Sequence, residues 1–333
     1  MRLFIVLIFL LAARAPSAAQ SDSLPLAPVA RFQQAVALSV TSLDEIFVLD
    51  GGLSKLYKLD RDGKVVMSVG GFGTDRDAFD TPLDITADGI NVFIADRGNQ
   101  RIVQYDRFLN FVTLLQNRPT SIDPFASDGR SSSLSTQLWR PISVSVSAQG
   151  DLYILEETQR QVIRINPLTF ASQQQQRQNP TQFEFGGFNA GKGNLAEPYR
   201  LTTSRTGKVF VSDGNLRSVM VFDLFGNFVT ELGKGVFSAP RSLACGQVET
   251  TWSGVKQLQE WLLVVDSDHV FVFDADQQTA FRFIGKISSE ELRRLFGTAF
   301  AGLIDIALTS ERLFVLTPKS LYTVPLALIR FAE

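Results

Sequence analysis

The chain has 333 residues, with 32 basic against 34 acidic side chains, one cysteine and one histidine. This near-balance of charge argues against a strongly electrostatic partner such as nucleic acid. Cys245 alone cannot form an internal disulfide or a cysteine-ligated zinc site, and His269 alone excludes a site built on two or three histidines.

The N-terminus has the pattern of a secretory signal. A basic start precedes the apolar run Leu3–Ala13, and small residues follow up to Ala19. The run is too short for a membrane anchor, since a bilayer span needs about 20 apolar residues. We therefore expect residues 1–19 to be a signal peptide and residues 20–333 to form one exported domain, periplasmic or extracellular, with no membrane span.

The rest of the chain contains a repeated pair of apolar segments. In four copies an aromatic residue lies three positions before an acid, and a second polar marker follows that acid ten positions later; these copies are 47–60, 93–106, 153–166 and 210–223. A shorter copy covers 263–274 and a degenerate one 314–324. Each copy predicts strand, tight turn and strand, because the segments are short, β-branched and aromatic-rich and are bounded by Asp, Gly and Asn.

Further strands are predicted on either side of each copy. One strand follows most copies, at Lys64–Val69, Asn110–Leu115 and Asn227–Leu232. Another precedes them and begins at a proline, where the missing N–H costs no ladder bond. These prolines are Pro82, Pro141, Pro198 and Pro240. Six units of about 52 residues with four strands each predict an all-β, six-bladed β-propeller with four-stranded antiparallel blades.

The repeat resembles a known family. The proline-led strand start, the stretch Phe93–Asp106 and the glycine linker Gly70–Gly73 together resemble the NHL repeat, here of the exported bacterial type. The resemblance covers most of 35–325 and implies a six-bladed propeller. It implies no particular activity, because such propellers include binding modules and enzymes. The WD40 pattern does not fit, since no Trp-Asp dipeptide occurs.

Closure of the ring requires an outer strand for the last unit. Pairing the two ends of the chain would remove an exposed edge. We expect Val29–Gln33 to supply this strand, with Leu326–Phe331 as the alternative. Ser288–Glu291 has the pattern of a capping box and predicts a short helix.

Two segments depart from the repeat. Ser172–Asn194 is predicted to be a long polar loop, and Gly246–Gln259 an insertion in the fifth unit.

The residues two positions after each strand-opening proline are the candidate binding site. The first strand of each blade lines the central channel of a propeller, so these side chains converge. They are Asp84, Ser143, Arg200 and Ser242, with Asp305 at the aligned position of the sixth unit. Such a set could bind an anionic ligand or a divalent cation, for which Asp84 and Asp305 are the candidate ligands. The alternative is a water-filled channel whose charges pair with one another.

Five acids recur, each at the end of the second strand in one of the first five units. They are Asp50, Asp96, Glu156, Asp213 and Asp266. Their regular recurrence argues against catalysis, which needs a unique constellation, so we predict that each caps its own turn by accepting backbone N–H groups.

Two functions are compatible with these features. The first is a non-catalytic binding or scaffold propeller, expected to be monomeric and without a cofactor, that presents loops on one face to a protein, peptide or glycan. The second is a calcium-dependent, lactonase-like hydrolase or lyase with the metal in the channel. The resemblance implies Glu, Asn and Asp ligands for such a metal, and only Asp84 and Asp305 are present here.

Overall fold

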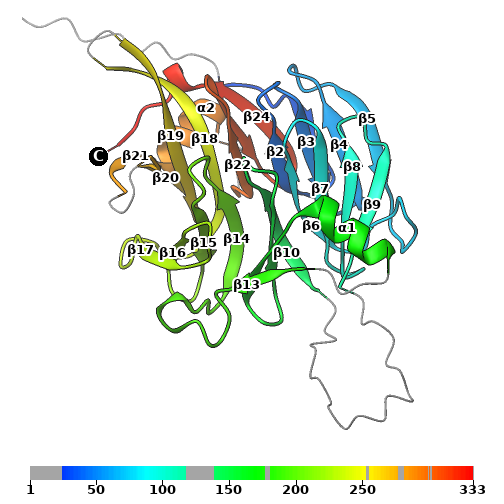
Figure 1. Ribbon diagram of the computed structural model, residues 1–333. Helices are drawn as coiled ribbons and strands as arrows, with labels where there is room; N and C mark the ends of the chain where they lie inside the picture. The colour runs from blue at the N-terminus through cyan, green and yellow to red at the C-terminus, as the bar shows by residue number, and fades with distance from the viewer. Residues whose placement is uncertain are drawn as a thin grey trace, which may run out of the picture.

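The computed structural model describes residues 25–117, 139–176, 181–252, 255–276, 281–298, 300 and 302–332, so the predicted signal peptide lies outside the described residues. Six four-stranded sheets are arranged around a common centre (Figure 1), and every strand pair in them is antiparallel. The predicted six-bladed propeller is therefore confirmed.

The first three blades follow the chain from the innermost strand outward. Blade one consists of β2 (Ala35–Val40), β3 (Ile46–Asp50), β4 (Lys55–Leu59) and β5 (Val65–Gly70). Blade two consists of β6 (Pro82–Ala87), β7 (Asn91–Asp96), β8 (Arg101–Asp106) and β9 (Phe111–Leu115). Blade three consists of β10 (Pro141–Val146), β11 (Leu152–Glu156), β12 (Gln161–Ile165) and β13 (Phe183–Phe185).

The last three blades repeat this order. Blade four consists of β14 (Pro198–Thr203), β15 (Val209–Asp213), β16 (Ser218–Phe222) and β17 (Phe228–Leu232). Blade five consists of β18 (Pro240–Trp252), β19 (Val255–Asp266), β20 (His269–Asp274) and β21 (Phe283–Ile287). Blade six consists of β22 (Asp305–Leu308), β23 (Arg312–Leu316), β24 (Ser320–Pro325) and β1 (Ala30–Arg31).

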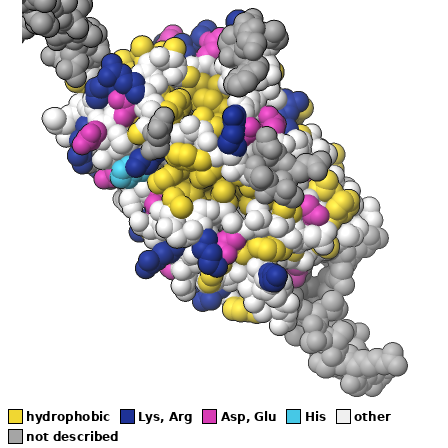
Figure 2. Space-filling view, turned by 90° about the vertical axis from the view of Figure 1, so that its left-hand side faces the viewer, with side chains coloured by type: hydrophobic (Ala, Val, Ile, Leu, Met, Phe, Trp, Pro, Cys, Tyr) yellow, Lys and Arg dark blue, Asp and Glu magenta, His cyan; other side chains and the backbone are white. Residues whose placement is uncertain are grey.

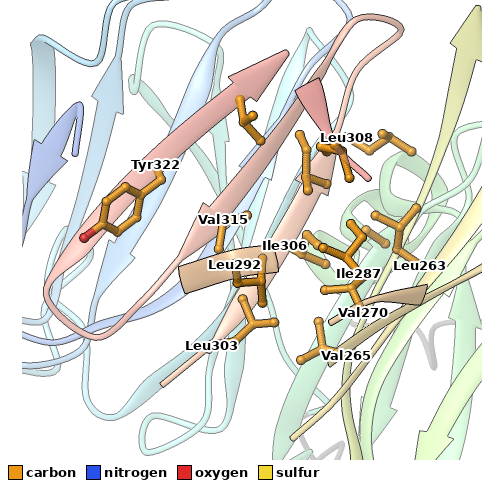
Figure 3. Close-up of a cluster of buried hydrophobic side chains, with 14 of the residues drawn as sticks. Leu263, Val265, Val270, Ile287, Leu292, Leu303, Ile306, Leu308, Val315 and Tyr322 are labelled. Carbon is orange, nitrogen blue, oxygen red and sulfur yellow. The ribbon is translucent and has the colours of Figure 1, made fainter. Parts of the chain in front are cut away.

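The hydrophobic core lies between the blades rather than inside one of them. Each buried cluster of the described residues joins two adjacent blades, as Leu263 and Val265 of blade five do with Ile306 and Val315 of blade six (Figure 3). The second strand of a blade is buried on both faces for this reason, and it consists mostly of Val, Ile, Leu and Phe. Packing between blades therefore holds the six innermost strands around one channel.

The N-terminal segment closes the ring, as predicted. β1 pairs with β24, with Ala30 opposite Leu321 and Arg31 opposite Ser320. The C-terminal end takes another place, because Ala332 forms a two-hydrogen-bond bridge with Lys286 of β21 in blade five. Figure 2 shows hydrophobic side chains gathered on the side of the molecule where blade five and the C-terminal end lie. The exposed ones from β21 and the C-terminal end include Phe283 and Phe331.

The loop predicted for Ser172–Asn194 is partly wrong. The helix α1 (Pro167–Gln175) runs into it, β13 lies within it, and a 3₁₀ turn covers Gly191–Gly193. Helix α1 begins with the residues that usually open a helix. The Asn166 side chain caps it by accepting from Thr169 N–H, and Pro167 occupies the first turn. Buried Phe170 then packs against Trp139, with ring centroids 5.1 Å apart.

Two other predicted features are present. The insertion in blade five is a β-hairpin, because β18 and β19 remain paired as far as Trp252 and Val255 and project beyond the blade (Figure 1). The predicted helix is α2 (Ser289–Phe296), in which Ser288 Oγ accepts from Glu291 N–H. A second 3₁₀ turn covers Leu326–Leu328. No helix of the described residues is long and apolar enough to cross a membrane.

Candidate functional site

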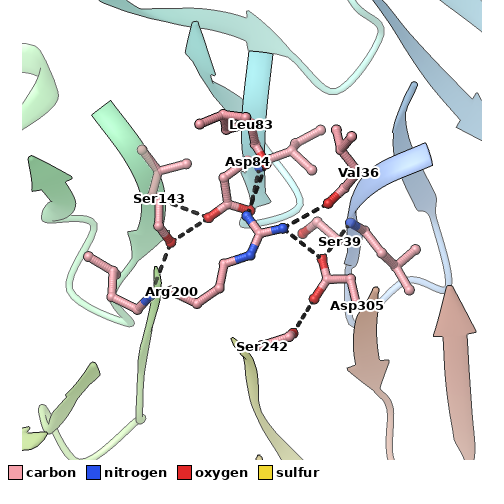
Figure 4. Close-up of polar contacts among 12 residues, drawn as sticks. Val36, Ser39, Leu83, Asp84, Ser143, Arg200, Ser242 and Asp305 are labelled. Carbon is pink, nitrogen blue, oxygen red and sulfur yellow. Dashed lines mark hydrogen bonds and ion pairs between the residues drawn. The ribbon is translucent and has the colours of Figure 1, made fainter. Parts of the chain in front are cut away.

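A repeated irregularity directs one side chain of each proline-led innermost strand to the channel. In β6, β10, β14 and β18 the pairing register shifts between the proline and the residue two positions later. A bulge of this kind re-aims a side chain. Figure 4 shows the result: Asp84, Ser143, Arg200, Ser242 and Asp305 converge at the centre of the ring. We call these five residues the Arg200 cluster.

The guanidinium of Arg200 lies between the two carboxylates of the cluster. Its Nη1 is 2.5 Å from Asp84 Oδ1, and its Nη2 is 3.7 Å from Asp305 Oδ2. The same nitrogens donate to the carbonyl oxygens of Leu83 (3.0 Å) and Val36 (2.8 Å). The side chain is 12% exposed. Through these contacts the arginine of blade four bridges blades one, two and six inside the channel.

The carboxylate of Asp84 is fully engaged. Oδ2 accepts from Ser143 Oγ (2.5 Å) and from Val144 N–H (3.0 Å). Oδ1 accepts from Ile85 N–H (2.8 Å) and from Arg200.

The carboxylate of Asp305 has a matching set of partners. Oδ1 accepts from Ser242 Oγ (2.5 Å) and Ile306 N–H (2.9 Å), and Oδ2 accepts from Leu38 N–H (2.8 Å). Burial raises the pKa of Asp305, while the charge of Arg200 acts to lower it.

These contacts cross from blade to blade in a regular way. Asp84 of blade two accepts the N–H of Val144 in blade three, and Ser143 of blade three accepts that of Leu201 in blade four. Asp305 of blade six accepts that of Leu38 in blade one. Asp84 and Ser143 lie two positions after the proline that opens their strand, and all three donors lie three positions after the start of the next innermost strand. The cluster therefore links neighbouring innermost strands.

The donor set of the cluster does not fit a calcium ion. Calcium takes six to eight oxygen ligands, whereas the four carboxylate oxygens here face a guanidinium, two hydroxyls and backbone N–H groups. Within the described ranges there is also no group of three or more His, Cys, Asp or Glu side chains that could hold a metal.

A cavity of about 600 Å³ lies above the cluster, on the face where the innermost strands begin, which we call the proline face. One lining residue comes from the position next to the cluster position in each of the six blades. These residues are Val36, Leu83, Ile142, Tyr199, Arg241 and Ile304. Of the Arg200 cluster, Arg200 itself lines this cavity. We call this space the proline-face cavity.

The rim of the proline-face cavity carries both signs of charge. Tyr199 Oη donates to Glu197 Oε1 at 2.9 Å, a bond that raises the pKa of the phenol. The guanidinium of Arg241 lies 5.9 Å from the centre of the Tyr199 ring. Glu157 pairs with Arg97 at 2.9 Å. An apolar wall with a polar rim is the usual make-up of a ligand pocket.

A smaller pocket of about 300 Å³ lies on the far side of the cluster. Hydroxyl groups in its wall form hydrogen bonds between neighbouring blades. Ser39 Oγ of blade one accepts from Ala87 N–H of blade two (3.0 Å), and Ser145 of blade three shares a hydrogen bond with Thr203 of blade four (2.9 Å). Cys245 lines it too, but burial and nearby Glu260 raise the pKa of the thiol well above its usual range. A protonated thiol of this kind is a poor nucleophile.

The predicted turn capping is confirmed for three of the five recurring acids. Asp50, Glu156 and Asp213 each accept N–H groups of their own turn, from Gly52, Thr158 and Leu216 among others. The remaining partners were not predicted. All five acids also accept backbone N–H groups from the segment before the innermost strand; the donors are Gln33, Asp80, Arg140, Ala196 and Ser238.

The walls of the proline-face cavity were missed by the sequence reasoning. A signal for them exists, since Leu83, Ile142, Tyr199 and Arg241 each follow a strand-opening proline directly. Neighbouring residues of a regular strand point to opposite sides. By this rule only the residue two positions after the proline would face the channel. The bulge breaks the alternation, so the residue before each cluster position lines the cavity as well.

Comparison with known proteins shows the fold. No family model and no curated protein sequence matches the chain. Among solved structures, a catalytically inactive virginiamycin B lyase from Staphylococcus aureus with quinupristin has a TM-score of 0.53 and 11% identity, over 88% of this chain and 80% of the other. A streptogramin B lyase has the same score and identity over 88% and 94% of the two chains. The RRP9 WD40 repeats have a TM-score of 0.54 and 9% identity over 90% and 95%.

Proposed function

We propose that this protein is a non-catalytic binding propeller that takes a peptide segment of a partner protein into the proline-face cavity. One observation carries the proposal. Five innermost strands, and Ile304 directly before the sixth, each contribute a residue to one cavity, and the charges of the Arg200 cluster already pair with one another. The cavity volume of about 600 Å³ lies in the range of ligand sites.

The chemistry of the cavity favours a peptide. Val36, Leu83 and Ile142 form apolar walls that suit an apolar side chain of a peptide. Glu197 and Arg241 place one negatively and one positively charged side chain at the rim. Backbone amides and side chains of a peptide can meet both kinds of group at once. A nucleic acid would need an excess of positive charge that this chain lacks.

Several features support a role without catalysis. The S. aureus lyase was solved as a His-to-Ala variant that is catalytically inactive. The single histidine of this chain, His269, begins β20 and is not among the residues that line the proline-face cavity. WD40 repeats and a mitotic checkpoint complex among the similar structures are consistent with protein binding.

Export and family membership remain predictions. The apolar run Leu3–Ala13 supports export of the chain from Gln20, and the stretch Phe93–Asp106 supports an NHL-like repeat. Both rest on sequence patterns.

A peptide selection tests the proposed function. Random peptides displayed on phage are selected on the immobilised chain from Gln20, and the enriched peptides are titrated by calorimetry. We expect Tyr199→Ala and Arg241→Glu to weaken binding about tenfold or more, because interface aromatics and arginines often dominate affinity. Arg61→Glu makes the same change of charge in the turn after β4, outside the cavity, and is expected to bind like the original chain. Equal losses in all three variants, or no enriched peptide, would contradict the proposal.

Calcium is expected to leave the stability unchanged. A ligand that binds only the folded state stabilises it by about 2.7 kcal/mol at a hundredfold excess over its Kd. Because the cluster does not fit a calcium ion, thermal melts in EDTA and in excess calcium should coincide. A rise of the melting temperature with calcium that disappears in Asp84→Ala would revive the metal-dependent hydrolase.

A further inference from the structure

Two arginines at the proline-face cavity have no acidic partner among the described residues. Arg160, in the turn after β11, and Arg241, in β18, both line the cavity. No carboxylate oxygen in the described part of the chain lies within 4.0 Å of either guanidinium. Both residues are exposed, so a ligand in the cavity can reach their charges.

The other charged side chains that line the cavity are already engaged. The guanidinium of Arg200 lies between the two carboxylates of its cluster. Glu157 accepts from Arg97 through both carboxylate oxygens, at 3.1 Å and 2.9 Å. Glu197 accepts from Tyr199 Oη. The charged donors that this lining leaves for a ligand are therefore those of the two unpaired arginines.

Each unpaired guanidinium lies over an aromatic ring. Arg160 lies 5.6 Å from the ring centre of Phe188, and Arg241 lies 5.9 Å from that of Tyr199. A contact with an aromatic face leaves the N–H groups at the edge of the guanidinium plane free. These N–H groups form a fork that matches the two oxygens of a carboxylate. Both arginines can therefore bind an anion without first giving up an ion pair.

The ring beside Arg241 is held in place by its surroundings. Tyr199 belongs to blade four, which packs between the blades of the two arginines, and its Oη donates to Glu197 at 2.9 Å. The ring also lies against Gly214, in the turn after β15, where a Cβ atom would come within 2.3 Å of it. Glycine allows such a close approach because it has no side chain. A ring fixed at two points gives the guanidinium of Arg241 a defined place at the cavity.

We propose that the peptide segment in the proline-face cavity carries a carboxylate, which Arg160 and Arg241 together recognise. This inference rests on the proposed function and narrows the class of partner. Two groups of a peptide supply such a carboxylate, the C-terminus and the side chain of Asp or Glu. The apolar walls of the cavity suit an apolar side chain beside it.

Four synthetic libraries of N-acetylated octapeptides test the proposal on the immobilised chain from Gln20. The peptides end in a carboxylate or in an amide, and each kind is made with and without Asp and Glu at its random positions. Mass spectrometry measures how much of each library is retained. We expect the library without any carboxylate to be retained about tenfold less than the best of the others, because hydrogen bonds to charged groups are among the strong ones. Dependence on the terminal group or on the acidic residues identifies the source of the carboxylate.

A matched pair of double variants assigns the effect to the two arginines. Arg160→Gln combined with Arg241→Gln should abolish the preference for carboxylates, because no charged fork remains. Arg61→Gln combined with Arg217→Gln removes the same charge outside the cavity and should keep it. Arg217 occupies the same left-handed turn position in blade four as Arg160 in blade three, with φ of 53° and 52°. Thermal melts check that both variants retain the fold.

The outcomes separate this inference from the proposed function. Equal retention of all four libraries, with less retention by Tyr199→Ala, would overturn the carboxylate and leave peptide binding in place. A preference for carboxylates that survives the changes at Arg160 and Arg241, or that is lost equally in the control variant, would also overturn it. Retention of no library by the chain would contradict both proposals.

Discussion

Arg200→Met is expected to lower the free energy of unfolding by about 3–5 kcal/mol, because removing one partner of a buried ion pair leaves uncompensated charge. Asp84 and Asp305 would face each other in the channel without the guanidinium that now bridges them. For a chain of this length the loss corresponds to a fall in melting temperature of roughly 5–8 °C. Differential scanning calorimetry measures it.

The matched control for Arg200→Met is the same change combined with Asp84→Asn and Asp305→Asn. The amides carry no charge, so the triple variant should regain the part of the stability that is lost through uncompensated charge, but not the backbone contacts in which an amide nitrogen replaces an accepting oxygen, such as that of Ile85 or Val144. A shift below about 1 °C for Arg200→Met would contradict the structural role assigned to the cluster.

The deficit of Arg200→Met should also depend on pH. Burial already raises the pKa of Asp305, and the loss of Arg200 removes the charge that lowers it. A raised folded-state pKa means that protonation favours the folded protein. The deficit is therefore smallest below the unfolded value near 3.8 and reaches its full size as the pH rises through the folded-state pKa.

Asp50→Ala is expected to cost about 2–4 kcal/mol, because several N–H groups lose their acceptor at once. The carboxylate is fully buried and accepts from Gln33 (2.7 Å), Gln34 (3.0 Å), Gly52 (2.9 Å) and Leu53 (3.2 Å). Two of these donors follow the closing strand β1, so the change also loosens the closure of the ring. Chemical denaturation of the chain from Gln20 measures the loss.

Asp60→Ala is the comparison for Asp50→Ala. Asp60 also caps a turn, accepting from Asp62 and Lys64, but these bonds are exposed and water can replace them. Its loss should stay below about 1 kcal/mol. Equal costs for the two variants would mean that turn capping alone, without the link to the N-terminal segment, explains the recurrence of these acids.

The fold and the positions of the channel residues could be predicted because both repeat. The spacing of aromatic residue, acid and proline recurs often enough along the chain to predict where the strands lie. The bulge after each proline then places Asp84, Ser143, Arg200 and Ser242 at equivalent points of their blades. The N-terminal closure was predictable too, since an unpaired edge at the last blade needs a strand from one of the two ends.

The contacts of Arg200 do not follow the repeat. Arg200 departs from the acceptors Asp84, Ser143, Ser242 and Asp305 of four other blades, and only the assembled ring shows that its side chain reaches Asp84 and Asp305. Helix α1 was missed because its glutamine-rich end has little apolar patterning, and it is held by one buried ring, Phe170.

Hydrogen exchange with and without a selected peptide tests most directly whether the proline-face cavity is the binding site. The binding account predicts slower exchange in the strand starts around Gln34–Val36 and Ala196–Tyr199, which line the cavity. Exchange in the far-side segments Ser145–Ser147 and Thr202–Ser204 should not change. Protection confined to the far side, or none at either place with the peptide bound, would contradict a binding site on the proline face.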